Sequence, residues 1–227
     1  MILAEGLGKC YTENSGELWP VRDVDIHVRR GAFTSIVGRS GSGKSTLLRM
    51  LGGLMTPSKG CVRIEGKPIY ELGERELAHY RCRKIGFIFQ DYFLEEMYTV
   101  YQNVEIVLMI SKVPENQRKE MIERALYLVG LPHKRDTYVK NLSGGEKQRA
   151  CIARAIVNNP DILFADEPCG NLDWENGKRI MELLREQAEQ GKTVVLVTHN
   201  REDARLTDEI ITLQDGKIID HEIMGHA

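Results

Sequence analysis

The stretch Gly38–Thr46 constrains this chain more than any other part of its sequence. It reads GRSGSGKST and fits the pattern G-x-x-x-x-G-K-[ST] at every fixed position. The residues before it, FTSIVG (33–38), form a short apolar run typical of a buried strand, and STLLRMLGGL after it has helical spacing. A strand, a glycine-rich turn and a helix in this order predict a loop whose backbone N–H groups surround an anion.

Individual positions of this phosphate loop have separate roles in the prediction. The glycines let the backbone curl inward, Lys44 would reach the β- and γ-phosphates of a nucleotide, and the Ser45 hydroxyl would bind Mg²⁺. The candidate nucleotide-binding residues of the loop are Gly38, Arg39, Ser40, Gly41, Ser42, Gly43, Lys44, Ser45 and Thr46. The alternative, a chance glycine-rich turn, is disfavoured by the strand and helix that flank the loop.

A second candidate site lies where the apolar run ILFADE ends in Asp166 and Glu167. A buried strand that finishes in an acid, downstream of a phosphate loop, is where a nucleotide enzyme places its Mg²⁺ ligand. Neighbouring residues at a strand end point in different directions, so Asp166 would bind Mg²⁺ while Glu167 polarises the attacking water as general base. The alternative is an acid pair that only caps a strand at a solvated loop.

The remaining segments alternate between strand-like and helix-like patterns. Apolar runs typical of buried strands are KIGFIFQ (84–90), DILFADE (161–167) and TVVLVTHN (193–200), whereas 100–131 and 175–191 have helical patterns and 208–220 resembles two strands around an Asp-Gly turn. The early segment alternates in short strands. The predicted fold class is α/β, with a mostly parallel sheet, an antiparallel β subdomain beside it and a helical lobe.

Composition narrows the class of partner and compartment. The formal charge of −2 on 227 residues shows no basic excess, so no nucleic-acid partner is expected. Five scattered cysteines favour a reduced, cytoplasmic environment. The most apolar stretches, EIVLMI and TVVLV, are too short to span a bilayer, so we expect that the chain does not itself cross a membrane.

The segment LSGGEKQR, Leu142–Arg149, resembles the signature motif of the ATP-binding subunits of ABC transporters. The resemblance covers nearly the whole chain, in the order of that family: Tyr11, GRSGSGKST, Gln90, LSGGEKQR, ILFADEP, GNLD (170–173) and VTHN with His199. It implies an Mg²⁺-dependent ATPase formed by one domain, 1–227, with a RecA-like core and antiparallel β subdomain in 1–90 and 140–227 and a helical lobe in about 91–139.

The resemblance also implies roles for residues outside the phosphate loop. Tyr11 would stack on adenine, and Gln90 would sense Mg²⁺ and the γ-phosphate and link the site to the helical lobe. His199 would contact the γ-phosphate and orient the water, and Asp173 would bond across a dimer. The alternatives are an ordinary tyrosine, a strand-end amide and a capping histidine.

The Ser143-Gly144-Gly145 corner would bind the γ-phosphate of an ATP held by a second copy of the chain, so that two ATP molecules are sandwiched between paired subunits. Read without the family, the same corner is a helix N-terminus with Ser143 as cap and Glu146 completing a capping box. Both readings hold together, because the cap geometry leaves N–H groups for an anion.

VGRSGSGKSTLLRMLGGLMTPSKG and ADEPCGNLD look most like the branch for lipoprotein release, macrolide and peptide export, and antimicrobial-peptide resistance. This resemblance implies a polytopic membrane permease as partner, a location on the inner face of the cell membrane, and a minimal subunit ending at Ala227. Cys169 departs from the family's small hydroxyl or alanine. The alternative function is a soluble ABC-type ATPase acting on nucleic acid or ribosomes. That function is disfavoured because the chain has one cassette and no long coiled-coil insertion.

Overall fold

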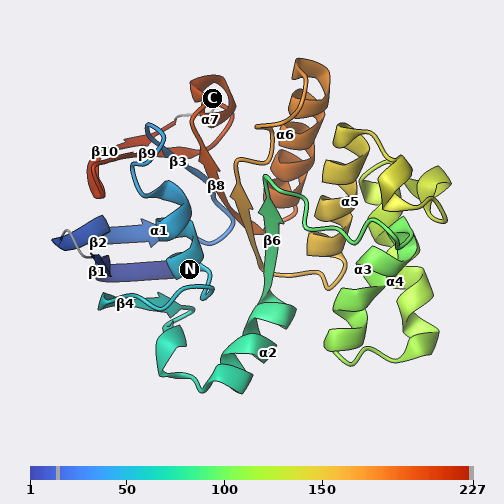
Figure 1. Cartoon of the computed structure of the whole chain (residues 1–227), viewed down its shortest axis with the longest axis horizontal. Coiled ribbons are helices and arrows are strands. Elements are labelled where there is room, and N and C mark those ends of the chain that lie inside the picture. Colours follow the sequence, from blue (N-terminus) through green and yellow to red (C-terminus); the bar gives the residue numbers. More distant parts are fainter. Residues whose placement is uncertain (14–15, 225–227) are drawn as a thin grey trace. The chain divides into compact units, whose positions relative to one another are not determined.

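A computed structural model describes residues 1–13 and 16–224 of the chain (Figure 1), so the chain end at Ala227 lies outside the described residues. The chain divides into two compact units, one formed by Met1–Ala78 with Gln187–Ala227 and the other by His79–Glu186. Within the described ranges, no helix combines the length and the apolar character needed to cross a membrane.

The first unit contains an antiparallel sheet with the strand order β2-β1-β4-β5. Its strands are β1 (Ile2–Glu13), β2 (Gly16–Val28), β4 (Lys59–Ile64) and β5 (Lys67–Pro68). The strands β1 and β2 are longer than the short strands expected from the sequence. Irregular pairing explains the difference, because the β1–β2 register shifts between Ala4 and Leu7 and twice more before Tyr11, and the strands continue past each shift.

A second group of strands in this unit is mainly parallel. The strands lie in the order β10, β9, β3, β8, with bounds β3 (Phe33–Val37), β8 (Thr193–Thr198), β9 (Glu209–Gln214) and β10 (Lys217–Ile223). β3 runs parallel to β8 and β9, and every residue of β3 and β8 is buried. The predicted Asp-Gly turn joins β9 to β10, with Asp215 and Gly216 both at positive φ, as a type I′ hairpin requires.

Three short helical elements complete the first unit: α1 (Lys44–Leu51), η1 (Ile69–Glu71) and α7 (Arg201–Ala204). Helix α1 follows the phosphate loop directly and packs against β1, β2 and β8. Its apolar residues Leu47, Leu48 and Leu51 are fully buried. The loop is therefore held between a buried strand and a buried helix.

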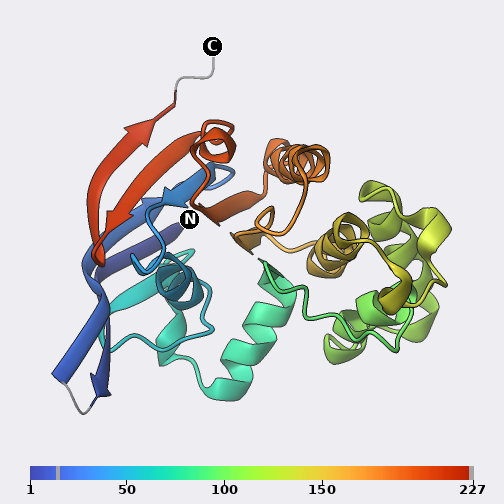
Figure 2. The same cartoon turned by 45° about the horizontal axis from the view of Figure 1, so that its top comes forward.

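The second unit combines two parallel strands with a group of helices. β6 (Ile85–Phe89) pairs with β7 (Ile162–Asp166), and the helices are α3 (Val100–Ile110), α4 (Glu115–Leu128) and α5 (Gly144–Ile156), with short turns η2 (Pro132–Lys134) and η3 (Val139–Asn141). α3 and α4 pack on each other and on α5 (Figure 2). α2 (Glu74–Lys84) and α6 (Trp174–Glu189) include the residues where one unit gives way to the other.

The predicted fold class is confirmed, with parallel strands, an antiparallel part and packed helices. Pro114 precedes α4 as its N-cap, and α6 ends before Gly191, which has φ +88°. The predicted helical lobe, 91–139, contains α3 and α4, and both lie in the second unit together with α5, β6 and β7. The assignment of 1–227 as one domain stays a prediction.

Candidate functional site

The phosphate loop lies in the first unit, immediately after β3, and two of its glycines are required by close backbone contacts. A Cβ on Gly38 would lie 2.2 Å from the Leu213 carbonyl oxygen, and a Cβ on Gly43 would lie 1.9 Å from the Pro20 carbonyl oxygen. Gly43 also has φ +99°, in the left-handed region. A side chain at either position would displace the backbone that shapes the loop.

The Lys44 side chain folds back over the start of the loop. Its Nζ donates to the Gly38 carbonyl at 2.9 Å and to the Arg39 carbonyl at 3.0 Å, and the residue is only 6% exposed. A lysine ammonium has three N–H donors, so these two bonds hold the charge at the loop and leave one donor over. The charge is thus placed where the sequence predicts a phosphate.

No side chain caps the start of α1, because its N-cap is Gly43. The first N–H groups of a helix have no partner within the helix, and they carry the positive end of its dipole. The start of α1 is therefore suited to an anion, and it includes the half-buried residues Ser45 and Thr46.

Other groups of the loop fit a ligand with several phosphate oxygens. Ser42 is 6% exposed, and its Oγ has no hydrogen-bond partner among the described residues. Arg39, Ser40 and Gly41 are exposed at the top of the loop. The donors that a nucleoside triphosphate requires are therefore present in the loop: the N–H groups at the start of α1, the Lys44 ammonium and the Ser42 hydroxyl.

Tyr11 and His199 also lie in the first unit. Tyr11 is 38% exposed, its hydroxyl donates to Met55 Sδ at 3.3 Å, and Lys9 Nζ lies 5.5 Å from its ring centroid. His199 follows the last residue of β8 and is exposed, and Asn200 rather than His199 caps α7. The structure therefore does not support the alternative of His199 as a capping residue.

The second unit carries the carboxylates and Gln90 at the ends of its two parallel strands. Phe89 and Asp166 are paired and are the last residues of the parallel strands β6 and β7. Gln90 and Glu167, which follow them, therefore leave the sheet at the same end of the two strands. Asp166 is 6% exposed, and Glu167 is half-buried. Gln90 is exposed, and its Nε2 donates to Asn171 Oδ1 at 3.4 Å, which places it against the GNLD segment.

Glu167 has an unusual backbone conformation, with φ +48°. This left-handed region is rare for a residue with a long side chain and costs on the order of 1 kcal/mol or more. The turn is closed by a bond from the Gly170 N–H to the Glu167 carbonyl at 3.1 Å. Such strain is characteristic of positions where a turn aims a functional side chain.

The predicted capping box at the signature motif is present. Ser143 Oγ accepts from the Glu146 N–H at 3.3 Å, and the Ser143 N–H donates to Glu146 Oε2 at 2.9 Å. This bond from the Ser143 backbone holds the pKa of Glu146 below its usual value, and Lys134 at 3.0 Å acts in the same direction. Ser143 and Gly144 are exposed, so the start of α5 is open to an anion, while Gly145 is buried.

Asn176 connects Asp173 to the signature helix, and sequence reasoning missed it. The Asp173 carboxylate accepts from the Asn176 N–H at 2.9 Å and from Asn176 Nδ2 at 2.8 Å, and the backbone bond lowers the pKa of Asp173. Asn176 Oδ1 in turn accepts from Arg149 Nη1 at 3.2 Å, and a Cβ on Gly145 would lie 2.2 Å from it. The Asp-x-x-Asn spacing at a helix start was the available signal.

Tyr92 is a second residue that the sequence did not reveal. Its carbonyl accepts from Cys151 Sγ at 2.9 Å and from Arg154 Nη2 at 2.9 Å, and its hydroxyl lies 3.1 Å from the position of a Cβ on Gly144. The segment after Gln90 is thereby attached to α5.

Two cysteines, Cys151 and Cys169, lie in this same unit. Burial raises the pKa of the Cys151 thiol to about 12. Cys169 Sγ donates to the Gly177 carbonyl at 3.5 Å.

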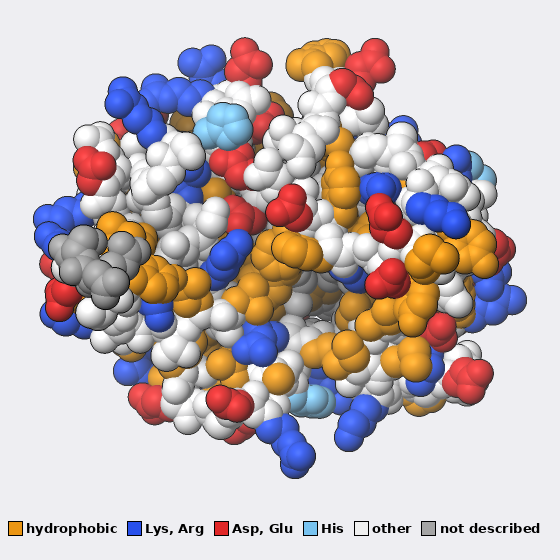
Figure 3. Space-filling view, in the orientation of Figure 1, with side chains coloured by type: hydrophobic (Ala, Val, Ile, Leu, Met, Phe, Trp, Pro, Cys, Tyr) orange, Lys and Arg blue, Asp and Glu red, His pale blue; other side chains and the backbone are white. Residues whose placement is uncertain are grey.

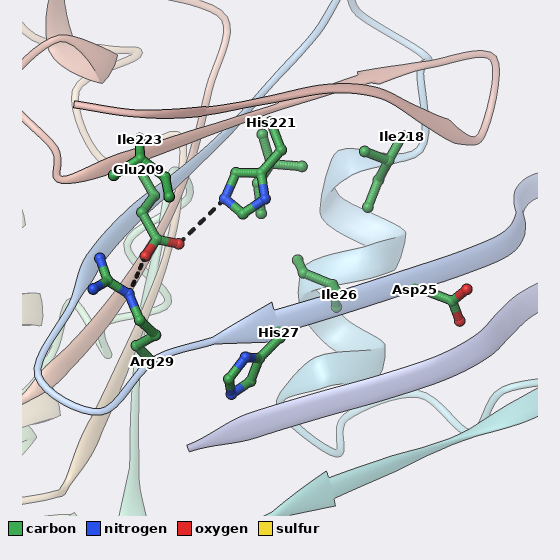
Figure 4. A pocket seen from close by; sticks show the side chains of 9 residues that line it. Asp25, Ile26, His27, Arg29, Glu209, Ile218, His221 and Ile223 are labelled. Atoms are coloured by element: carbon green, nitrogen blue, oxygen red, sulfur yellow. Dashed lines mark hydrogen bonds and ion pairs between the residues drawn. The ribbon is translucent and has the colours of Figure 1, made fainter.

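A cavity of about 260 Å³ in the first unit lies between β2 and the β9–β10 hairpin (Figure 4). Glu209, 2% exposed, accepts there from Arg29 Nε at 2.5 Å and lies 3.3 Å from His221 Nε2. None of the predicted site residues lines this cavity. Within the described part of the chain, no group of three or more His, Cys, Asp or Glu side chains could hold a metal ion.

Each unit therefore carries part of the predicted site. The first contains Tyr11, the phosphate loop with Lys44 and Ser45, and His199; the second contains Gln90, Ser143, Gly144, Gly145, Asp166, Glu167 and Asp173.

Comparison with known proteins identifies the family of the chain. The family model described as ABC transporter matches residues 21–170. An uncharacterised ABC transporter ATP-binding protein of Thermotoga maritima is 45% identical over 213 residues, 92% of this chain and 90% of that protein. The lipoprotein-releasing system ATP-binding protein LolD of Aquifex aeolicus is 44% identical, covering 88% of this chain and 89% of its own.

A longer relative and a solved structure extend the comparison. The macrolide export ATP-binding/permease protein MacB of Aggregatibacter actinomycetemcomitans is 39% identical over 96% of this chain, which spans 34% of that protein. The ATP-binding cassette MJ0796, solved as a dimer in a post-hydrolysis state with ADP and Pi, superposes with a TM-score of 0.93 at 36% identity over the full length of both chains. The chain belongs to the ABC transporter family, as an ATP-binding cassette that uses ATP and Mg²⁺ and hydrolyses the nucleotide.

Proposed function

We propose that the chain is the motor subunit of a membrane transporter of the lipoprotein-release and export branch, in which two copies close on two ATP molecules and drive a permease. One observation carries this proposal. The same chain contains a phosphate loop, whose Lys44 ammonium is bonded to the loop backbone, and a signature helix, whose capped start at Ser143 is exposed. The similarity to LolD and to the ATP-binding third of MacB supports the branch.

In the proposed site, Lys44 binds the β- and γ-phosphates and Ser45 and Asp166 hold Mg²⁺, with Gln90 contacting the metal as well. The ion needs only one or two carboxylates because phosphate oxygens and water complete its shell. When bound, Mg²⁺ neutralises charge that develops on the phosphates. Glu167 takes a proton from the attacking water, and His199 orients it.

The adenine contact and the second copy complete the proposal. Tyr11, which is 38% exposed and whose hydroxyl donates to Met55 Sδ, stacks on the base. Ser143 and Gly144 offer the N–H groups of an exposed helix start to the ATP of the partner copy, and Asp173 bonds across the same interface. The dimeric solved structures of MJ0796 support this pairing.

A hydrophobic surface in the second unit supports the permease partner. Phe93, Met97, Tyr98 and Tyr138 are 66%, 63%, 45% and 47% exposed. Backbone bonds join the segment after Glu96 to 137–140, which brings Tyr98 and Tyr138 onto neighbouring chain segments. Figure 3 shows hydrophobic side chains at the surface on the α3–α5 side of the view. Such a patch is typical of a protein interface and would hold the chain on the inner face of the membrane.

The permease attachment can be tested with a tagged Glu167→Gln variant. This variant should keep ATP affinity but lose about 10²- to 10⁴-fold in steady-state hydrolysis, as expected for removal of a general base. With Mg²⁺-ATP it should retain a polytopic membrane protein when pulled down from native membranes. Lys44→Ala should weaken ATP binding about 10- to 100-fold and pull down none, since charged hydrogen bonds contribute about 1.5–3 kcal/mol.

Recovery of nucleic acid or ribosomal proteins in place of a membrane protein would refute the transporter assignment and favour the soluble-ATPase alternative. Normal turnover by the Glu167→Gln variant would remove Glu167 as the base without changing the partner assignment.

A further inference from the structure

Trp174 is strongly exposed at the start of helix α6. It is the first residue of α6, directly after Asp173, and it is 73% exposed. Lys178, one turn further on, places its Nζ 5.5 Å from the ring centroid. This distance is within the range of a cation–π contact, and most of the Trp174 side chain stays in solvent.

The turn that presents Trp174 is fixed to the signature helix on both sides of this residue. Asp173 accepts both hydrogen bonds from Asn176, and Asn176 accepts from the buried Arg149 of α5. The side chain of Leu172 lies 3.7 Å from the position of a Cβ on Gly144. The turn that carries Trp174 therefore lies beside the exposed Ser143-Gly144 corner.

We propose that Trp174 packs against the second copy of the chain when the ATP-bound dimer closes, as an aromatic anchor of that interface. The proposal rests on the sandwich arrangement proposed above, which places the phosphate loop of the partner copy opposite the signature corner. Tryptophan in a preordered position loses little conformational entropy on burial and is among the residues that most often dominate interface energetics.

The charges of the two surfaces are complementary. The phosphate loop exposes Arg39 at its top, and the start of α6 exposes the Asp173 carboxylate beside the indole. A guanidinium is attracted both by a carboxylate and by an indole face. The partner copy therefore offers a cation that could stabilise this turn.

Tryptophan fluorescence tests the proposal directly, because the chain contains only two tryptophans, Trp19 and Trp174. In a Trp19→Phe, Glu167→Gln double variant, Trp174 is the single emitter. Adding Mg²⁺-ATP should produce a dimer by analytical ultracentrifugation and lower the acrylamide quenching constant at least about twofold, with a blue-shifted emission. The same protein carrying Ser143→Arg should bind ATP, stay monomeric and show no change in quenching.

The outcomes separate this inference from the proposed function. A dimer with unchanged quenching would overturn the role of Trp174 and leave the sandwich standing. Absence of an ATP-dependent dimer would overturn the sandwich and this inference with it. As a second measurement, Trp174→Ala should raise the dimer dissociation constant about tenfold or more. Tyr127→Ala, at a residue that is 75% exposed on α4, should leave it unchanged and serves as the matched control. Equal effects of the two substitutions would contradict the assignment.

Discussion

Replacing Asn176 by alanine tests whether this side chain joins Asp173 to the signature helix. The substitution removes the acceptor for Arg149 Nη1, and Arg149 is 8% exposed with a buried Nε that already has no partner. Leaving a buried donor without its partner costs about 1–3 kcal/mol. Alanine is the better helix former by about 0.5 kcal/mol, which offsets part of this loss.

The expected net loss in the free energy of unfolding is therefore about 0.5–2.5 kcal/mol. The bond to the exposed Asp173 adds little, because water can replace it. With a urea m-value of about 2 kcal/mol/M, the midpoint followed by far-UV circular dichroism should fall by about 0.3–1.3 M. Asn141→Ala, at an exposed asparagine before the signature motif, is the matched control and should shift stability by less than about 0.5 kcal/mol.

Asn176→Asp separates the two contacts. Aspartate keeps an acceptor for Arg149 but places a second carboxylate where Nδ2 donates to Asp173. The Asp173 pKa, held low by the Asn176 N–H in the native chain, should then rise, and dimer closure should weaken more than stability. Equal urea midpoints for Asn176→Ala and the native chain would refute the reasoning, because they would show that Arg149 does not depend on Asn176.

Three further predictions rest on other local contacts. The lowered pKa of Glu146 means that its stabilising contribution is present above the unfolded-state pKa of about 4.3 and is lost as pH falls through the folded-state pKa. The difference in unfolding free energy between the native chain and Glu146→Gln should therefore be largest at neutral pH and should narrow as the pH falls below about 4.3. A constant difference in urea titrations at several pH values would contradict this. Gly43→Ala should lower the free energy of unfolding by more than about 2 kcal/mol and abolish ATP binding. Gly41→Ala, with φ +79° but no atom within 4 Å of its Cβ position, should lower the free energy of unfolding by about 1 kcal/mol. Similar losses for the two variants in thermal unfolding would refute the distinction. Cys151→Ser should leave the number of thiols that react rapidly at pH 8 unchanged, because the native thiol is buried with a pKa near 12; one fewer reactive thiol in a colorimetric assay would count against it.

Local sequence patterns predicted those parts of the fold and site that depend on neighbouring residues. The apolar run that ends at Asp166 forms the buried strand β7, and Ser143 with Glu146 forms the capping box that their spacing indicates. Helix α2 was missed because its sequence is almost wholly polar, and none of its residues is buried. The contacts of Asn176 and Tyr92 depend on tertiary packing against α5, which no local pattern encodes. The left-handed backbone conformation of Glu167 could not be predicted from the sequence either, because glutamate rarely adopts this conformation.

That backbone has a consequence for how this position can change over evolutionary time. A glycine at 167 would adopt φ +48° without the strain that glutamate bears, so the substitution that deletes the proposed base is also the one that relaxes the turn. Selection for folding and selection for turnover therefore oppose each other at a single codon. A chain with glycine at 167 would therefore lose the proposed base while its turn adopted φ +48° without the steric strain that glutamate bears.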